Sequence, residues 1–263
     1  MIKSYFKTAW RNLNRSRLYS FVNIAGLSLG MAASILILQY VNFEFSYDTF
    51  NVNKNDIYRV VNDRFQEGRL VQHSTQTYSA VGRALKEDYP EVANYTRIAS
   101  LSPRILITEN KKSTFDGMAV DGSFLSMFSY PLKSGDQDYA LTEPTSIVLS
   151  ENAANRMFGS TSDNYSSILG KLIQIERNPV PYKVTAVCAN IPANSHLQFD
   201  FLVPYISLYT GGNKFWKQAE YSFTESYFFH YIQLKPGTNY KVFEQKLPAF
   251  SSRHFKGNTV SGS

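Results

Sequence analysis

Apolar residues form one long uninterrupted run near the N-terminus and only short runs after it. Residues 18–41 contain no charged side chain over 24 positions. A helix that crosses the hydrocarbon core of a bilayer needs about 20 mostly apolar residues. The pattern therefore predicts a short segment over 1–17, one transmembrane helix over 18–41 and one large domain over 42–263.

Basic residues gather before the apolar run, and this asymmetry predicts the orientation of the helix. Residues 1–17 contain five basic and no acidic residues, whereas Lys54 and Arg59 are the only basic residues in 42–61. Cytoplasmic flanks of membrane helices carry such an excess of Lys and Arg. We therefore expect the N-terminus in the cytoplasm and residues 42–263 on the other side of the inner membrane.

The alternative to a membrane anchor is a cleaved signal peptide. Such a peptide turns polar after its small-residue cleavage site. Here the small pair Ala32-Ala33 is followed by the apolar residues 35–38. The sequence therefore favours an anchor that is retained.

The segment 1–17 has a helical pattern of its own. Its apolar residues recur at helical spacing, and its basic residues stand four apart. The basic stripe consists of Lys3, Lys7, Arg11 and Arg15. A helix of this kind lies on the membrane surface with its basic side toward anionic headgroups. The alternative is an ordinary positively charged flank without a defined helix.

Small residues within the apolar run predict a packing face. Gly26 and Gly30 form a GxxxG pair, and small residues allow a second helix to approach closely. We therefore expect this helix to pack against other transmembrane helices. The same stretch matches the G-x-S-x-G pattern of hydrolases, but that motif requires a strand, a turn and a helix in water. We dismiss it inside a membrane helix.

Beyond residue 42, the apolar pattern alternates irregularly between strand-like and helix-like spacing. This favours an α+β fold with mixed or antiparallel sheets. The predicted strands are 56–61, 70–77, 95–100, 104–108, 146–149, 172–176, 182–189, 197–203 and 226–234. The predicted helices are 78–89, 124–128, 151–158 and 240–250. The strand 70–77 is expected to pair with 56–61 across a turn at Glu67-Gly68, and 109–113 is expected to be a turn.

Local signals mark the ends of one helix and the candidate borders between two lobes. Ser150 is a favourable N-cap with Glu151 in the first turn, and Gly159 is a typical residue just past a helix C-terminus. The Gly-, Ser- and Asp-containing stretches 134–143 and 159–167 are candidate lobe boundaries.

The net charge of +6 belongs to the N-terminus rather than to the domain. The chain has 27 basic and 21 acidic residues, and removing the five basic residues of 1–17 leaves 22 basic residues against the same 21 acidic ones. A nucleic-acid-binding domain would carry the excess positive charge itself. We therefore exclude nucleic acid as a partner.

Motifs of catalytic or metal chemistry are absent from the sequence. It contains neither a Walker A loop nor an HExxH motif. The four histidines, which have no ligand spacing, are His73, His196, His230 and His254. Cys188 is the only cysteine and lies in an apolar run, so we expect a buried core residue. We assign no catalytic, cofactor-binding or metal residues and expect no enzyme activity in this chain.

Several strings, taken in order, resemble the MacB/FtsX-type permeases of ABC transporters. Near the N-terminus these strings are Tyr5–Leu13, Asn23–Gly30, Phe45–Phe50 and Asn55–Val60. Further on they are Asp121–Phe128, Pro144–Glu151 with Phe158-Gly159, Gly170-Lys171, Tyr182–Val187, Ile191–His196 and Phe199–Phe201. The resemblance extends over essentially the whole chain, and the order of the strings is more specific than any one of them.

This resemblance implies a permease with one helix, a bilobed MacB-like periplasmic core domain over 42–263, and three further helices. One lobe is expected to be similar to the porter domains of efflux pumps. The implied partners are a separate cytoplasmic ABC ATPase and a second permease, in a homodimer or heterodimer, with a periplasmic adaptor as a further candidate. The implied function is efflux, or mechanotransmission of ATP-driven motion to the periplasm, without a cofactor in this chain.

The sequence departs from the family pattern at its end. It stops at Ser263 without the later helices, so we expect a fragment of a longer permease or a truncated product. Two alternatives stay open. One is a stand-alone membrane-anchored sensor or adaptor domain, and the other is a membrane-tethered hydrolase, which would require converging titratable groups in a pocket.

Overall fold

The chain folds as two compact units, Met1–Tyr47 and Asp48–Ser263. The computed structural model describes residues 5, 10, 11, 15, 17–159, 164–209, 214–224 and 226–255. Each unit has its own internal contacts.

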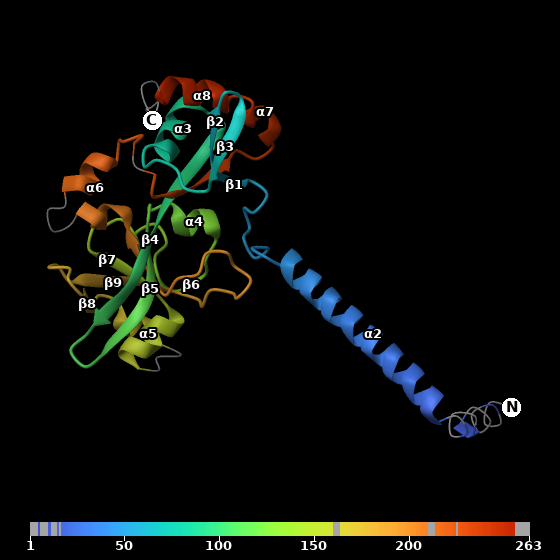
Figure 1. The fold of residues 1–263 in the computed structure, drawn as a ribbon. Coiled ribbons are helices and arrows are strands. Elements are labelled where there is room, and N and C mark those ends of the chain that lie inside the picture. The colour runs from blue at the N-terminus through green and yellow to red at the C-terminus, as the bar shows by residue number, and fades with distance from the viewer. Residues whose placement is uncertain are drawn as a thin grey trace. The chain divides into compact units, whose positions relative to one another are not determined.

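The first unit is dominated by one continuous helix, α2 (Arg17–Phe45), which contains the whole predicted span 18–41 (Figure 1). None of its 29 residues is buried within the chain. At 1.5 Å per residue the helix is about 43 Å long, which exceeds the roughly 30 Å of a bilayer's hydrocarbon core. The described part of the chain contains no other helix that is long and apolar enough to cross a membrane.

The second unit is built on a nine-stranded mixed sheet. Its strand order is β1-β11-β4-β5-β10-β7-β9-β6, and β8 pairs with both β4 and β9. The strands are β1 (Ile57–Val60), β4 (Val92–Ile107), β5 (Lys112–Val120), β6 (Leu132–Gly135), β7 (Ser146–Ser150), β8 (Leu172–Ile175), β9 (Tyr182–Cys188), β10 (Phe201–Pro204) and β11 (Phe229–Leu234). Among them, β5–β10 and β7–β9 pair in parallel and the other pairs are antiparallel. This confirms the predicted α+β class with a mixed sheet.

A separate two-stranded sheet and several short helices complete the unit. The two-stranded sheet consists of β2 (Asn62–Gln66) and β3 (Arg69–Ser74). The helices are α3 (Val81–Asp88), α4 (Phe124–Phe128), α5 (Glu151–Phe158), α6 (Lys214–Ala219), α7 (Tyr240–Glu244) and α8 (Leu247–His254). Two 3₁₀ turns, η1 (Tyr165–Ile168) and η2 (Tyr205–Tyr209), lie between them in sequence.

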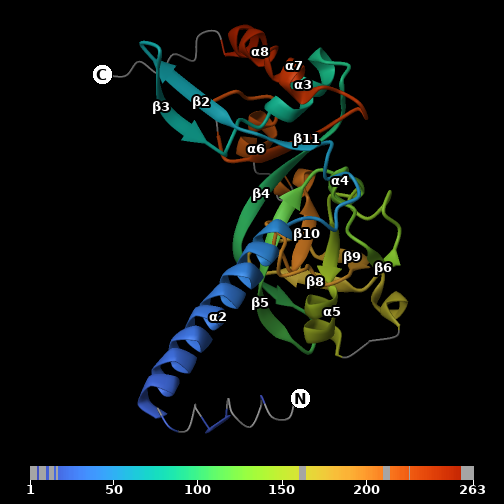
Figure 2. The same cartoon turned by 90° about the vertical axis from the view of Figure 1, so that its right-hand side faces the viewer.

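Strand β4 joins the two ends of the large sheet. Its first half pairs with β11 and its second half pairs with β5 on the opposite edge. Ile98 is the one residue in the register of β4 that pairs with both β11, through Phe229, and β5, through Val120. Figures 1 and 2 show β4 as the long strand that runs through both ends of the domain. The two ends therefore share a continuous backbone ladder through a single strand.

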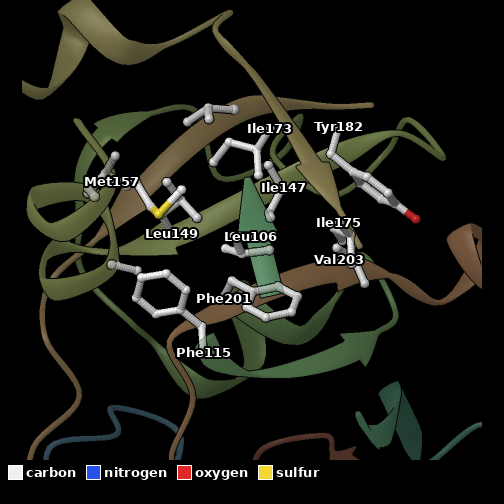
Figure 3. Packing of buried hydrophobic residues seen from close by; sticks show 14 of the residues in the cluster. Leu106, Phe115, Ile147, Leu149, Met157, Ile173, Ile175, Tyr182, Phe201 and Val203 are labelled. Carbon is white, nitrogen blue, oxygen red and sulfur yellow. The ribbon is translucent and has the colours of Figure 1, made fainter. Parts of the chain in front are cut away.

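The central strands are buried on both faces, so their side chains divide between two cores. In β7, Ile147 and Leu149 belong to one core and Val148 to the other, as the alternation of a strand requires. Helix α5 packs over the first core and α4 contributes to the second. Figure 3 shows the first core, with Phe115, Leu106, Leu149 and Phe201 packed side by side.

A third core closes the end of the sheet that contains β1 and β11. Helix α3, which lies within the predicted helix 78–89, places Val81, Ala84 and Leu85 against this end. Phe243 of α7 and Phe250 of α8 pack into the same cluster. These C-terminal helices therefore complete a core that begins more than 150 residues earlier in the sequence.

The pairing of the first predicted strand was wrong. The hairpin across Glu67-Gly68 exists, but its strands are β2 and β3, whereas β1 pairs with β11. The apolar residues Ile57 and Tyr58 of β1 pack against the second and third cores. Burial of β1 against the distant strand β11 therefore outweighs pairing with the nearby hairpin. The spacing of residues around β1 does not predict this partner.

Strand β5 was missed, and the predicted turn 109–113 extends too far, because β5 begins at Lys112. The strand contains Asp116-Gly117, residues that ordinarily indicate a turn. Gly117 is needed here for space, because a Cβ atom at this position would lie 2.2 Å from Cζ of Phe201. The predicted strands 95–100 and 104–108 are one strand, β4, with a register shift between Leu101 and Arg104.

Other differences concern lengths and boundaries. Strand β6 was missed, the strand predicted over 197–203 is limited to β10, and that predicted over 226–234 begins at Phe229. The helix predicted over 240–250 is two helices, and Pro248 lies in the first turn of the second, where a proline is tolerated. The candidate lobe boundaries at 134–143 and 159–167 stay predictions, because the division of the chain into units falls between Tyr47 and Asp48; residues 160–163 lie outside the described residues.

Candidate functional site: the anchor at the start of the sheet domain

The second unit begins with a segment that is held firmly in place. Asp48 adopts a left-handed backbone with φ of 54°, which is uncommon for a residue other than glycine. Its N–H donates to the carbonyl oxygen of Asn194 at 2.9 Å. The backbone therefore turns sharply three residues after the end of α2 and meets the loop that precedes β10.

The Asp48 carboxylate makes three contacts with this loop. Its Oδ2 lies 2.5 Å from Nδ1 of His196, and its Oδ1 accepts from the backbone N–H of His196 at 3.2 Å. The hydroxyl of Ser195 donates to the same Oδ1 at 3.2 Å. One carboxylate thus binds a side chain, a backbone amide and a hydroxyl of adjacent residues.

The contact continues from His196 into the sheet. Its Nε2 lies 2.7 Å from the hydroxyl of Tyr231 on β11. Burial raises the pKa of Tyr231, so this phenol stays protonated near neutral pH. We call the set Asp48, Ser195, His196 and Tyr231 the anchor, because it ties the first residue of the domain to the central sheet.

The residues that follow Asp48 strengthen the anchor. Phe50 packs on Tyr130, with the ring centroids 5.6 Å apart, and belongs to the second core. Asn53 donates from Nδ2 to the carbonyl oxygen of Met127 at 3.1 Å. Tyr130 in turn lies 3.4 Å from Ser195. The segment is therefore held by polar contacts at its start and by apolar packing just beyond.

An Asp–His pair could also belong to a hydrolytic triad, but the third group does not fit. A triad requires an accessible nucleophile at the far nitrogen of the histidine. Here that nitrogen faces the phenol of Tyr231, which is 4% exposed and has a raised pKa. The arrangement can hold segments together, and it contains no activated nucleophile among the described residues.

A second polar cluster lies in the interior, beside Ile98 of β4. We call it the Arg97 network; it consists of Thr77, Ser79, Arg97, Asp121, Tyr205 and His230. The Arg97 guanidinium donates to Asp121 from Nε at 3.0 Å and from Nη2 at 2.7 Å, and it lies over the ring of Tyr205 at 3.7 Å. Burial disfavours the charged guanidinium, but Asp121 outweighs it, and the pKa of Arg97 is raised.

His230 is the fully buried member of this network. Its Nδ1 lies 2.7 Å from the hydroxyl of Thr77, and its Nε2 lies 3.3 Å from the carbonyl oxygen of Ser79. A carbonyl only accepts, so Nε2 bears the proton and Nδ1 accepts from Thr77. Burial, and after it the Arg97 cation, lowers the pKa of His230 to about 4. His230 is therefore neutral in the folded protein at physiological pH.

The predicted packing residues lie on α2. Gly26, Gly30 and Ser34 line a shallow groove along the helix, and a Cβ atom at either glycine would meet nothing within 4 Å. The hydroxyl of Ser34 donates to the carbonyl oxygen of Gly30 at 2.9 Å, so the groove presents little unpaired polarity. Whether a second helix fills this groove stays a prediction.

The basic stripe is described only in part. Arg11 and Arg15 are helical and exposed, whereas Lys3 and Lys7 lie outside the described residues. Cys188 is fully buried, as predicted, and burial raises its pKa to about 12. No group of three or more metal-ligating side chains occurs in the described ranges.

Sequence reasoning missed the anchor although both of its strings were recognised. The strings Phe45–Phe50 and Ile191–His196 are two of those that resemble the permease family. Nothing in their spacing predicts that Asp48 and His196 are in contact. A usable signal is the combination of an acidic residue just after a membrane helix with an isolated Ser-His pair. The Arg97 network was missed as well, because its members lie up to 153 residues apart.

Together, the long apolar helix and the mixed sheet domain indicate a membrane-anchored protein with one large domain outside the bilayer. The sequence matches the MacB-like periplasmic core domain over residues 20–250. The chain belongs to this family of permease periplasmic domains, which is not a catalytic family. No curated protein matches the sequence significantly.

Two solved structures share the fold. One is a domain of a protein described as a permease, from Porphyromonas gingivalis, with 22% identity and a TM-score of 0.63 over 78% of this chain and 83% of that one. The other is the periplasmic region of MacB from Actinobacillus actinomycetemcomitans, with 18% identity and a TM-score of 0.52 over 76% of this chain and 84% of that one. At these identities the likeness concerns the fold.

Proposed function

We propose that this chain is the N-terminal part of an ABC transporter permease subunit that transmits ATP-driven motion across the membrane to its periplasmic domain. The ATPase is a separate cytoplasmic subunit, and the permease acts as a dimer. Helix α2 crosses the inner membrane with its N-terminus in the cytoplasm, and residues 42–263 lie in the periplasm. In the periplasm, the resulting motion of the domain drives efflux or is passed on as a mechanical signal.

The anchor is the observation that carries this proposal. Only Ser46 and Tyr47 separate the end of α2 from Asp48, which is tied to the loop 194–196 by its amide and both carboxylate oxygens. A displacement of the helix end along the chain reaches the sheet through this point because so few residues intervene. The path continues through His196 to Tyr231 on β11.

The groove on α2 supports a second part of the proposal, contact with other transmembrane helices. In lipid, close approach of backbones replaces hydrophobic burial as a source of helix association, and glycines permit it. Gly26, Gly30 and Ser34 are spaced four apart and therefore lie on one side of the helix. The basic residues Arg11 and Arg15 favour the cytoplasmic leaflet.

Co-purification of helix variants tests the proposal. The native protein is purified in mild detergent, together with a G26L/G30L variant and an S28L/A32L control, and bound partners are identified by mass spectrometry. Ser28 and Ala32 are also small and four apart, but lie about 200° around the helix. We expect an ABC ATPase and a second permease with the wild type and the control, and a several-fold loss of partner with G26L/G30L.

Two results would contradict the proposal in different ways. Absence of an ATPase from the wild-type preparation would favour a stand-alone anchored sensor or adaptor domain. Equal recovery of partners with G26L/G30L and S28L/A32L would leave the permease assignment intact but exclude this face as the packing face.

A further inference from the structure

A cleft opens on the sheet domain at the turn between β8 and β9, away from the anchor. Its volume is about 360 Å³, within the range of roughly 300–1,000 Å³ that small-molecule sites occupy. Strands β4, β9 and β10, the β8–β9 turn and the 3₁₀ turn η2 surround it. The lining residues that matter here are Leu101, Arg104, Arg177, Tyr182, Val203 and Ser207.

The floor of the cleft is apolar and rigid. Tyr182 and Val203 are each 2% exposed, and with Ile175 they belong to the first core. Figure 3 shows these three side chains next to one another at one edge of that core, with the Tyr182 hydroxyl directed away from it. A flat apolar group would therefore meet a surface that is already in place, with a hydroxyl at its edge.

The rim of the cleft has an excess of positive charge. Arg104 and Arg177 are both exposed, and within the described chain neither is ion-paired. Glu176 is the acidic lining residue, but it is engaged by Lys112 at 2.9 Å. Two guanidinium groups beside an apolar floor match a carboxylate, which arginine binds through two parallel hydrogen bonds.

Arg177 is held in an uncommon conformation. Its φ is 65°, in the left-handed region that favours glycine. The neighbouring Asn178 maintains the turn, because its side chain accepts from Val180 N at 3.1 Å and donates to the Tyr182 hydroxyl at 2.9 Å. The left-handed backbone and these two hydrogen bonds therefore fix the turn that places Arg177 in the lining of the cleft.

We propose that this cleft binds a small organic carboxylate with a flat or branched apolar body. Arg104 and Arg177 hold the carboxylate, while the hydroxyl of Tyr182 is already bonded by Asn178 and Ser207 and helps to fix the floor of the cleft. Leu101, Val203 and the Tyr182 ring contact the apolar body. None of the lining residues of the cleft belongs to the anchor or to α2, so ligand binding here can be tested apart from the proposed path of motion.

Calorimetric titration of the full chain in neutral detergent tests this proposal. The probes are naphthalene-2-carboxylate and its neutral amide, with the heat of protein-free micelles subtracted. The variants are R104Q, R177Q and R177G, and the control is R69Q, which removes an exposed arginine of β3. We expect saturable binding of the carboxylate, at least about tenfold weaker binding of the amide, and a loss of about tenfold in R104Q and R177Q.

The variant R177G separates binding from folding. Glycine removes the backbone strain, so R177G should be at least as stable to heat as the wild type while binding the carboxylate as weakly as R177Q. The proposal is overturned if the wild type shows no saturable binding, if carboxylate and amide bind equally, or if R104Q and R177Q bind as tightly as R69Q.

Discussion

Two carboxylate-centred clusters tie distant segments of this domain together, and they differ in burial and in the side chain that the carboxylate contacts. In the Arg97 network the paired side chains of Arg97 and Asp121 are 5% and 16% exposed. In the anchor the paired side chains of His196 and Asp48 are 34% and 28% exposed. The distances are similarly short, at 2.7 Å and 2.5 Å. The comparison therefore sets a buried arginine pair against a partly exposed histidine pair at similar distances.

The difference in burial indicates which cluster stabilises the fold and which one holds the start of the domain to the sheet. A charge pair in the interior loses its hydration, so removal of one partner leaves a charge that nothing compensates. A pair near the surface exchanges its partner for water at little cost. We therefore expect the Arg97 network to stabilise the junction at Ile98, and the anchor to determine how the start of the domain is held without contributing much to folding.

The largest effect is expected from breaking the buried pair. R97M leaves the Asp121 carboxylate buried without its partner and should lower the free energy of unfolding by about 3–5 kcal/mol. The double variant R97M/D121N removes both charges and should lose less than the sum of the single losses. Urea unfolding of the full chain in detergent measures this. Additive losses would show that the pair is not coupled.

The second-largest effect is expected from pH, because the buried His230 makes the free energy of unfolding depend on pH. The pKa of His230 is about 4 in the folded protein and about 6.5 in an unfolded chain, so the unfolded state binds the extra proton between these values. Stability should therefore be highest above pH 6.5 and fall by about 3 kcal/mol as the pH approaches 4. Urea unfolding from pH 7.5 to 4.5 measures the slope.

Variant H230N provides the control for this pH dependence, because its side-chain oxygen can still accept from Thr77. The slope between pH 6.5 and 4.5 should flatten in H230N but not in H73N, which alters an exposed histidine of β3. If H230N keeps the wild-type slope, another group is responsible. The carboxylates Asp88 and Glu91 are not candidates over most of this range, because His254 and Lys246 lower their pKa values and their effect on stability appears only near and below their ordinary pKa values.

The smallest effect on stability is expected at the anchor. A change there should instead reduce the ATP-driven motion of the sheet domain. D48N preserves the shape of Asp48 and should change the free energy of unfolding by less than about 1 kcal/mol. In the ATP-driven complex, spin labels at the exposed Tyr139 of each subunit should show a smaller ATP-dependent distance change than in the wild type. The native Cys188 is fully buried and should not be labelled.

A matched control sharpens the prediction for the anchor. Asp63 and His73 of the β2–β3 hairpin form a pair of the same type at the same 2.5 Å distance. D63N should leave the ATP-dependent distance change intact, because that hairpin lies outside the proposed path. An equal reduction in D48N and D63N, or none in either, would remove the anchor from the mechanism.

Several features of this protein follow from the sequence without any tertiary information. The helix over 18–41 can be predicted from 24 positions without a charged residue, because a continuous apolar run of this length is a property of the local sequence alone. The cap of α5 is also local, since the Ser150 side chain accepts from the N–H of Ala153 only three residues away. Mixed α+β topology is readable because strands and helices interleave along the chain.

The tertiary structure alone decided which distant segments meet. β1 pairs with a strand some 170 residues later, and Asp48 reaches His196 across 148 positions. The glycine of β5 indicates a turn by its type, yet it lies in a strand, where the Phe201 ring occupies the space that a Cβ atom would need. Local patterns reflect the preference of each residue for its own backbone conformation. The anchor, the Arg97 network and the arginine-lined cleft instead arise from packing between segments that meet only when the chain folds.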